Sequence, residues 1–248
     1  MFSLNKRIIS SDNNEENPYT MSFSDMMAGM LIIFILVCST LIYQLQDKRI
    51  KINDELKKLI ETIHIRDEML LEIKSKLKEL NINVQIDEDS LIIPITEIGF
   101  DSGSDKILPQ YKWKAIALGQ TLCDVFEKNN RWKKLETVFI EGHTDSKNYY
   151  GLKGNWGLST FRAISLWEFW IDSDECKQFG YKLKNMRVEN QSNKIISLFS
   201  VSGYADTRKI IENEQEEKDF ARNRRINIRF VMQQIHPSDL KKIIDSAF

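Results

Sequence analysis

The stretch Met26–Tyr43, MMAGMLIIFILVCSTLIY, decides the class of fold, because it holds eighteen residues without a charged side chain. A helix rises about 1.5 Å per residue, so a helix over residues 22–46 crosses the ~30 Å hydrocarbon layer of a bilayer. A cleaved signal peptide has a shorter apolar part after a basic segment, and a small-residue cleavage site. Residues 11–17 are instead polar and partly acidic, and Gln44–Asp47 is a poor cleavage site. The run predicts an uncleaved transmembrane helix over residues 21–46.

The composition of the 248-residue chain argues against several kinds of protein. Lys and Arg number 35 and Asp and Glu number 36, whereas nucleic-acid-binding faces are strongly basic. No nucleic-acid partner is therefore expected. The three cysteines have no CxxC spacing and the three histidines are scattered, so neither a disulfide framework nor a metal site is expected. The length leaves room for one domain of about 150 residues beside the helix.

Asp25 is an unusual residue, because it stands at the entry to the apolar run. A carboxylate at the centre of a membrane helix costs ~2.5–3.5 kcal/mol, and such acids usually face protein or water. A helix cap at the membrane surface is an equal alternative, since Ser22 and Ser24 precede Asp25 and the helix dipole favours an acid in the first turn. Position alone leaves both interpretations open.

The next segment carries the most regular pattern in the chain. Apolar residues recur at steps of three and four, with Arg49 and Arg66 as interruptions, at Ile52, Leu56, Leu59, Ile63, Leu70, Ile73, Leu77, Leu80 and Val84. This heptad seam predicts a helix that pairs with a second copy, as a coiled-coil stalk over residues 47–83 that extends about 50 Å from the membrane. Packing of this helix on its own domain is the alternative.

The same heptad phase extends back into the membrane helix. It runs through Ser24 and Ala28, which places Asp25 one residue away from the seam. In a homodimer each carboxylate would then lie at the margin of the contact and point towards whatever surrounds the pair.

Beyond residue 84 the pattern changes, and it predicts an α/β (α+β) domain over residues 84–235, followed by a tail over residues 236–248. The expected elements are a hairpin at 83–86 and 91–95, helices at 108–128 and 158–171, and strands at 137–141, 195–203 and 226–231. Strands that alternate with helices indicate one sheet covered by helices. Residues 172–194 show no clear period and predict an excursion between helix and strand.

Five phrases in this region occur in the order typical of OmpA-like peptidoglycan-binding domains, which residues 84–233 closely resemble. They are FDSGS at 100–104, IEGHTD at 140–145, NWGLSTFRA at 155–163, GY at 203–204 and RNRRINI at 222–228. The resemblance implies a β/α/β/α/β-type fold that clamps the diaminopimelate of a peptide stem. It also implies that Asp145 and Arg162 hold this ligand and that Asn155 and Leu158 line the same pocket.

The chemistry of the ligand suits this assignment. Diaminopimelate carries an ammonium and a carboxylate on one carbon, so its binding needs an acid and a base a few ångströms apart, and Arg grips a carboxylate with two parallel hydrogen bonds. An Asp145–Arg162 pair that only braces a strand against a helix is the structural alternative. Arg222, Arg224 and Arg225 look more like bracing or rim residues.

With the phrase SFSDMM at residues 22–27, the whole chain also resembles MotB, the anchoring subunit of flagellar stators, and most of all the MotB-like B components of Zorya anti-phage defence systems. This resemblance implies a homodimer inside a ring of a MotA-like, multi-span subunit (ZorA-like), with Asp25 as the ion carrier. It implies an inner-membrane protein with a cytoplasmic tail over residues 1–20 and a periplasmic wall-binding domain, without cofactor or enzymatic activity. A flagellar MotB subunit and a passive wall tether are the alternatives.

Two further observations bear on this interpretation. A hydrolase finds no support, because the chain has neither a nucleophile elbow nor an HExxH motif. The positive-inside rule, by contrast, opposes the predicted orientation, since five basic residues between 48 and 58 outnumber Lys6 and Arg7. We give the pocket motif more weight, because peptidoglycan lies outside the inner membrane.

Overall fold

The computed structural model describes residues 18–101, 103–190, 192 and 194–233. The predicted C-terminal tail and residues 1–17 of the predicted N-terminal tail lie outside this range. The described residues divide into two compact units, residues 18–54 and residues 55–233. Helix α1, Pro18–Glu79, contributes to both of them.

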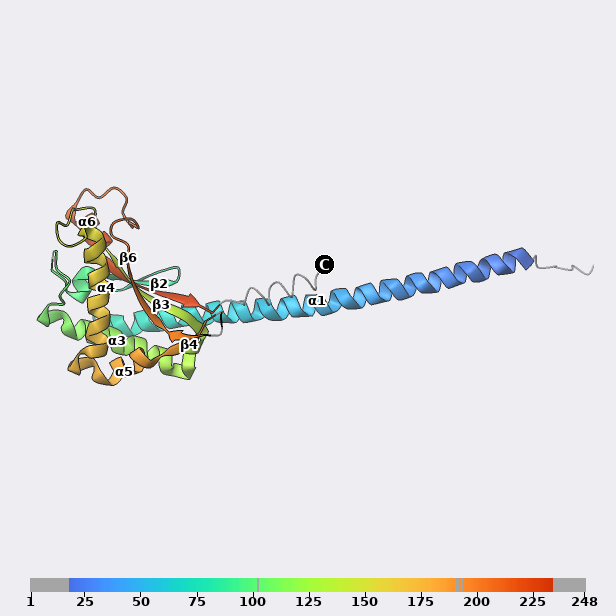
Figure 1. The fold of residues 1–248 in the computed structure, drawn as a ribbon, viewed down its shortest axis with the longest axis horizontal. Coiled ribbons are helices and arrows are strands. Elements are labelled where there is room, and N and C mark those ends of the chain that lie inside the picture. Colours follow the sequence, from blue (N-terminus) through green and yellow to red (C-terminus); the bar gives the residue numbers. More distant parts are fainter. Residues whose placement is uncertain (1–17, 102, 191, 193, 234–248) are drawn as a thin grey trace, which may run out of the picture. The chain divides into compact units, whose positions relative to one another are not determined.

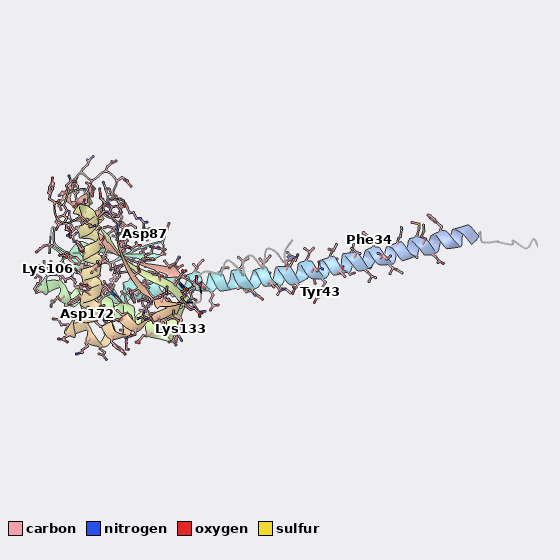
Figure 2. All side chains as sticks on the ribbon, viewed as in Figure 1. Phe34, Tyr43, Asp87, Lys106, Lys133 and Asp172 are labelled. Atoms are coloured by element: carbon pink, nitrogen blue, oxygen red, sulfur yellow. The ribbon has the colours of Figure 1, made fainter. Side chains whose placement is uncertain are left out.

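In the first unit, α1 is long and apolar enough to cross a membrane between Phe23 and Asp54. Its large apolar side chains are exposed from Phe23 to Ile52, as Figure 2 shows for Phe34 and Tyr43. An apolar helix without a protein core around it needs another apolar environment, and a bilayer supplies one. The predicted order of an N-terminal apolar helix followed by an α/β domain is confirmed.

The second unit is built on a mixed five-stranded sheet with the order β1-β2-β7-β3-β6 (Figure 1). Its strands are β1 Gln85–Asp87, β2 Ser90–Pro94, β3 Leu135–His143, β6 Phe199–Gly203 and β7 Arg225–Met232. Only β3 and β6 pair in parallel, and the other neighbours are antiparallel. The predicted strands at 137–141 and 226–231 are therefore the central ones, where alternating apolar side chains such as Val138, Ile140 and Ile228 enter the core.

Helices cover the sheet and connect its strands. They are α2 Ile95–Ile98, α3 Lys112–Glu127, α4 Gly154–Asp172, α5 Lys177–Asn185 and α6 Glu217–Asn223, with 3-10 turns at Pro109–Tyr111, Lys128–Lys134 and Asp174–Cys176. Helix α4 crosses the sheet beside β3 and β6 (Figure 1). It comes close because Gly142 has no side chain: a Cβ there would overlap the main-chain carbonyl of Ser159. This close approach brings the end of β3 and the start of α4 together.

The heptad seam of α1 divides into two parts. Ile52, Leu56 and Ile63 are 40–49% exposed, whereas Leu70, Ile73 and Leu77 are at most 1% exposed and belong to the hydrophobic core of the second unit. The last turns of the predicted stalk thus pack on their own domain. An apolar seam indicates that one face of a helix is buried, but it does not distinguish between burial by a second helix and burial by a sheet.

The region around residues 172–203 differs in detail from the sequence-based expectation. The excursion contains α5 and β4, Arg187–Glu189, which pairs with β5, Ile195–Ser197, in a separate two-stranded sheet. The strand expected over residues 195–203 is therefore two strands, β5 and β6, divided at Leu198. The main-chain N–H of Leu198 donates to Met186 and its carbonyl accepts from Val138, so this residue switches the chain from one sheet to the other.

Candidate functional site: a charged pocket at the end of strand β3

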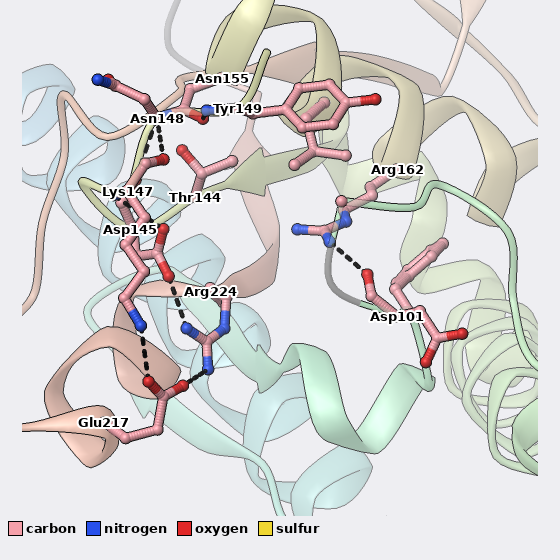
Figure 3. Close-up of a pocket in the computed structure, with 13 residues that line it drawn as sticks. Asp101, Thr144, Asp145, Lys147, Asn148, Tyr149, Asn155, Arg162, Glu217 and Arg224 are labelled. Atoms are coloured by element: carbon pink, nitrogen blue, oxygen red, sulfur yellow. Dashed lines mark hydrogen bonds and ion pairs between the residues drawn. The ribbon is translucent and has the colours of Figure 1, made fainter. Parts of the chain in front are cut away.

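A pocket of about 280 Å³ opens where β3 ends and α4 begins (Figure 3). Its walls come from the loop after α2, the loop between β3 and α4, the first turns of α4, and α6 with the residue after it. All four binding residues predicted from the sequence line this pocket, namely Asp145, Asn155, Leu158 and Arg162. The structure adds Thr144, Lys147, Tyr149 and Glu217, which no pattern singled out, and Arg224, which the sequence suggested as a bracing or rim residue.

Arg162 is the buried base of the pocket, with 2% of its surface exposed. Its Nε donates to the main-chain carbonyl of Ser104 (2.8 Å), and its Nη2 donates to that of Asp101 (2.9 Å). Burial lowers the pKa of Arg162 to about 10, and the nearby positive charge of Arg224 adds to this effect. The guanidinium still carries its charge at neutral pH. Among the described residues, no carboxylate forms a salt bridge with it, so this charge can serve an anionic ligand.

Asp145 is the buried acid, and its partner differs from the one expected. Its Oδ2 accepts a hydrogen bond from Nη1 of Arg224 (2.6 Å), and its Oδ1 accepts one from the main-chain N–H of Lys147 (3.1 Å). The expected arrangement put Asp145 beside Arg162. The structure brings both residues to the same pocket but pairs Asp145 with Arg224, one of the arginines interpreted as bracing residues.

A chain of ion pairs continues from Asp145 to the rim. Arg224 Nη2 donates to Oε1 of Glu217 (2.6 Å), and Lys147 Nζ donates to Oε2 of the same carboxylate (2.7 Å), as Figure 3 shows. The side chains of Lys147 and Glu217 are both more than half exposed. The phrase RNRRINI gave a signal for Arg224, but no pattern in the sequence marks Glu217, which precedes that phrase on α6.

Asn155 shapes the loop between β3 and α4. Its Oδ1 accepts from the main-chain N–H of Tyr149 (3.2 Å), and its Nδ2 donates to the carbonyls of Asp145 (3.3 Å) and Lys147 (3.1 Å). One amide side chain therefore forms hydrogen bonds with three main-chain groups of this loop, which would otherwise lack the partners that a helix or a sheet provides. Asn155 is a positioning residue for Asp145, and Leu158 supplies an apolar wall.

Two neighbouring residues, His143 and Thr144, have buried polar side-chain atoms without a hydrogen-bond partner among the described residues. They are both ring nitrogens of His143 and Oγ1 of Thr144. Thr144 lines the pocket, is 3% exposed, and its Oγ1 has no hydrogen-bond partner among the described residues. A buried hydroxyl of this kind is costly unless something pairs with it. His143 stacks on Tyr204 with 5.4 Å between ring centroids. Burial lowers the pKa of His143 to about 3, with Arg225 and Arg208 adding to the shift, so this ring is neutral.

The chemical character of the pocket follows from these groups. It offers a guanidinium without a salt bridge, a buried carboxylate and one apolar wall, which together suit a small zwitterionic head group such as that of an amino acid. Within the described residues, no cluster of three or more His, Cys, Asp or Glu side chains could hold a metal ion.

Asp25, the predicted ion carrier, lies in the first unit and is not part of this pocket. It is exposed on α1, within the segment that could span a membrane. Its functional role remains a prediction from the sequence.

Comparisons with known proteins test the resemblance to MotB and to the B components of Zorya systems. No protein-family model matches the sequence. The Zorya protein ZorB of Escherichia coli is 24% identical over 225 residues, which cover 88% of this chain and 89% of ZorB. The predicted resemblance is confirmed. A match over 88% of the chain extends beyond the pocket domain.

Several solved structures show a partial structural similarity to this chain. A putative MotB-like protein from Desulfovibrio vulgaris has a TM-score of 0.49 and 18% identity, and the match covers 71% of this chain and 97% of that one. The periplasmic domain of Helicobacter pylori MotB has a TM-score of 0.48 and 18% identity, with 66% and 90% covered. The cell wall anchor of the T6SS from Pseudomonas aeruginosa has a TM-score of 0.46 and 20% identity, with 68% and 99% covered.

Proposed function

We propose that the chain is a peptidoglycan-anchored, ion-conducting, stator-like subunit of an inner-membrane motor in a Zorya-type anti-phage defence system. The observation that carries this proposal is the similarity to ZorB, which covers 88% of this chain and is therefore not confined to the pocket domain. A wall-binding domain joined to a membrane helix with one acidic residue is the arrangement that a wall-anchored ion carrier needs.

The pocket supports the wall-binding part of the proposal. The amino-acid end of a diaminopimelate stem carries one carboxylate and one ammonium. Arg162 is available for the carboxylate, and Asp145 can receive the ammonium when Arg224 moves or shares its Oδ2. The hydrogen bonds of Arg162 to the loop at residues 101–104 hold its guanidinium in place before binding, which lowers the entropy cost of recognition.

The membrane helix supports the ion-carrying part. Asp25 has an exposed side chain within the apolar segment, where a charged carboxylate is expensive and a functional role is the default expectation. A proton can neutralise such a carboxylate on one side, and loss of that proton can restore its charge on the other. Each charge that crosses gains about 2.3 kcal/mol per 100 mV, which can drive rotation of a surrounding ring.

The proposed partners follow from the same helix. One helix in each copy cannot enclose an ion path, so the proposal includes a ring of a MotA-like, ZorA-like subunit with several membrane spans. The exposed part of the seam, at Ile52, Leu56 and Ile63, provides an apolar face for a second copy. The C-terminal domain is placed in the periplasm, where its ligand lies, and the N-terminal tail in the cytoplasm.

Copurification from membranes tests the proposal. The full-length chain, expressed in its own host, should bring down a multi-span, MotA-like protein. The variant Asp25→Asn should bring down the same protein, because it leaves the rest of the helix unchanged. If the chain binds cell wall but no such membrane protein copurifies, a passive wall tether replaces the motor subunit as the proposed function.

A reporter enzyme fused after Phe248 tests the orientation. A reporter that works only in the periplasm should be active, whereas one that works only in the cytoplasm should be silent. The opposite pattern would contradict the wall-anchored arrangement, because the pocket could not reach peptidoglycan.

A further inference from the structure

Arg224 occupies the position at Asp145 where a ligand's ammonium would bind. Its Nη1 lies 2.6 Å from Oδ2 of Asp145, while the other carboxylate oxygen already accepts from a main-chain N–H. The side chain of Asp145 is 9% exposed, so little room remains beside it for another cation. A ligand ammonium can therefore reach Asp145 Oδ2 only if Arg224 moves or shares that oxygen.

Glu217 provides an alternative partner for a displaced Arg224. Its carboxylate already accepts from Nη2 of Arg224 at 2.6 Å, and its side chain is 67% exposed at the pocket rim. Arg224 can give up Asp145 and keep one charge-assisted hydrogen bond, so displacement does not leave a guanidinium without a partner. Lys147, which shares Glu217, has space to move because it is more than half exposed.

The charge balance of the pocket follows from this pairing. Arg224 neutralises Asp145, whereas Arg162 has no salt bridge among the described residues. The positive charges of Arg162 and Arg224 also act on each other, as the lowered pKa of Arg162 indicates. As long as Arg224 holds Asp145, the pocket attracts a carboxylate more strongly than an ammonium.

We propose that Arg224 is the specificity-determining residue of this pocket, because it competes with the ligand ammonium for Asp145 and adds to the attraction of Arg162 for the ligand carboxylate. This inference rests on the proposed wall-binding function. It predicts that removal of the Arg224 charge has opposite effects on two ligands, one that carries a free ammonium and one that lacks it.

Calorimetric titration of the full-length chain in lipid nanodiscs tests this inference. The first probe is a muramyl tripeptide that ends in meso-diaminopimelate, and the second is the same peptide with its free amine acetylated. The variant Arg224→Gln should bind the free peptide about tenfold more tightly than wild type, equivalent to about 1.4 kcal/mol. It should bind the acetylated peptide less tightly than wild type, because one positive charge has left the pocket.

Two further variants make the test specific. Arg222→Gln removes the same charge from an exposed position on α6 that does not line the pocket, and it should leave both affinities unchanged. Glu217→Gln leaves Arg224 with Asp145 as its carboxylate partner, so it should weaken binding of the free peptide relative to the acetylated one. This variant is also useful if Arg224→Gln folds poorly, because Glu217 is largely exposed.

The outcomes separate this inference from the proposed function. If wild type binds neither peptide, the wall-binding function fails and the inference fails with it. If wild type binds the free peptide but Arg224→Gln weakens both peptides equally, wall binding stands and the role of Arg224 as a competitor is overturned.

Discussion

The guanidinium of Arg162, on α4, donates a hydrogen bond to the main-chain carbonyl of Asp101, 2.9 Å away and 61 residues earlier in the chain. A second bond to the carbonyl of Ser104 fixes the same loop. The residue proposed to bind the ligand carboxylate is thus also the residue that fastens one wall of the pocket. The proposed ligand binding and the position of this loop therefore depend on the same side chain.

Replacement of Arg162 by lysine should weaken wall binding although it keeps the charge. Lysine has one ammonium in place of a planar fork, so it cannot hold both carbonyls and grip a carboxylate at the same time. We expect a loss on the order of tenfold in affinity for purified peptidoglycan sacculi, measured by cosedimentation of the full-length chain. Arg222→Lys, at an exposed position outside the pocket, is the matched control. Equal sedimentation of both variants would contradict a binding role for Arg162.

A second ion-pair cluster joins α1 to the turn after α3 and should make stability depend on pH. Glu72 accepts hydrogen bonds from Arg131 (2.6 Å) and Lys128 (3.0 Å) and pairs with Lys76 (3.4 Å). Burial alone raises the pKa of Glu72, but these cations outweigh it and lower the pKa to about 2, from 4.5 in an unfolded chain. The stabilisation is therefore fully present above about pH 4.5 and is lost as the pH falls towards about 2.

Thermal unfolding of the full-length chain, followed by tryptophan fluorescence, measures this effect. Glu72→Gln should lower the midpoint relative to wild type near neutral pH, and the difference should shrink as the pH falls from about 5 to about 3. Glu79→Gln, at an exposed position later in α1, should show no such dependence. A difference between wild type and Glu72→Gln that stays constant over this range would mean that the ion pairs do not set the stability of this contact.

The elements with a clear period were predictable from the sequence, whereas the identity of their partners was not. The strands around Val138 and Ile228 and helix α4 show alternation or helical spacing, and the structure has them close to the expected positions. The buried half of the α1 seam shows the limit, since Leu70 and Leu77 have the same spacing as the exposed half. A period reports that a face is covered and does not say whether a second chain or the same chain covers it.

The site shows a similar limit. The four residues expected in the pocket line it, because the motif phrases fix their positions just after β3 and on α4. The partner of Asp145 was not predictable, since Arg224 comes from a segment 79 residues later and pairs with it only through the fold of the sheet. Glu217 lay outside every motif. Contacts between distant segments depend on side-chain geometry that the spacing within one phrase does not contain.

Cysteine cross-linking should locate the end of the proposed dimer contact on α1. In a chain with Cys38, Cys123 and Cys176 replaced, Leu56→Cys lies on the exposed part of the seam and should form a disulfide with its copy. Leu71→Cys is even more exposed, 62% against 49%, but lies off the seam and should not. Leu70→Cys should also fail, because Leu70 lies in the core of its own domain. Efficient cross-linking at position 70 would show that the coiled coil displaces this packing.

Substitution of Asp25 by asparagine is the direct test of the ion-carrying role. Asparagine keeps the size and much of the hydrogen-bonding capacity of aspartate, but it cannot carry a proton between two charge states. A capping role, the alternative from the sequence, is contradicted by the structure, because α1 begins at Pro18, seven residues before Asp25. If Asp25 carries the ion, Asp25→Asn should assemble normally with its membrane partner and yet abolish resistance in a plaque assay. Asp25→Glu keeps a titratable carboxylate and should retain part of the activity. Full resistance with Asp25→Asn would rule out ion transfer through this residue.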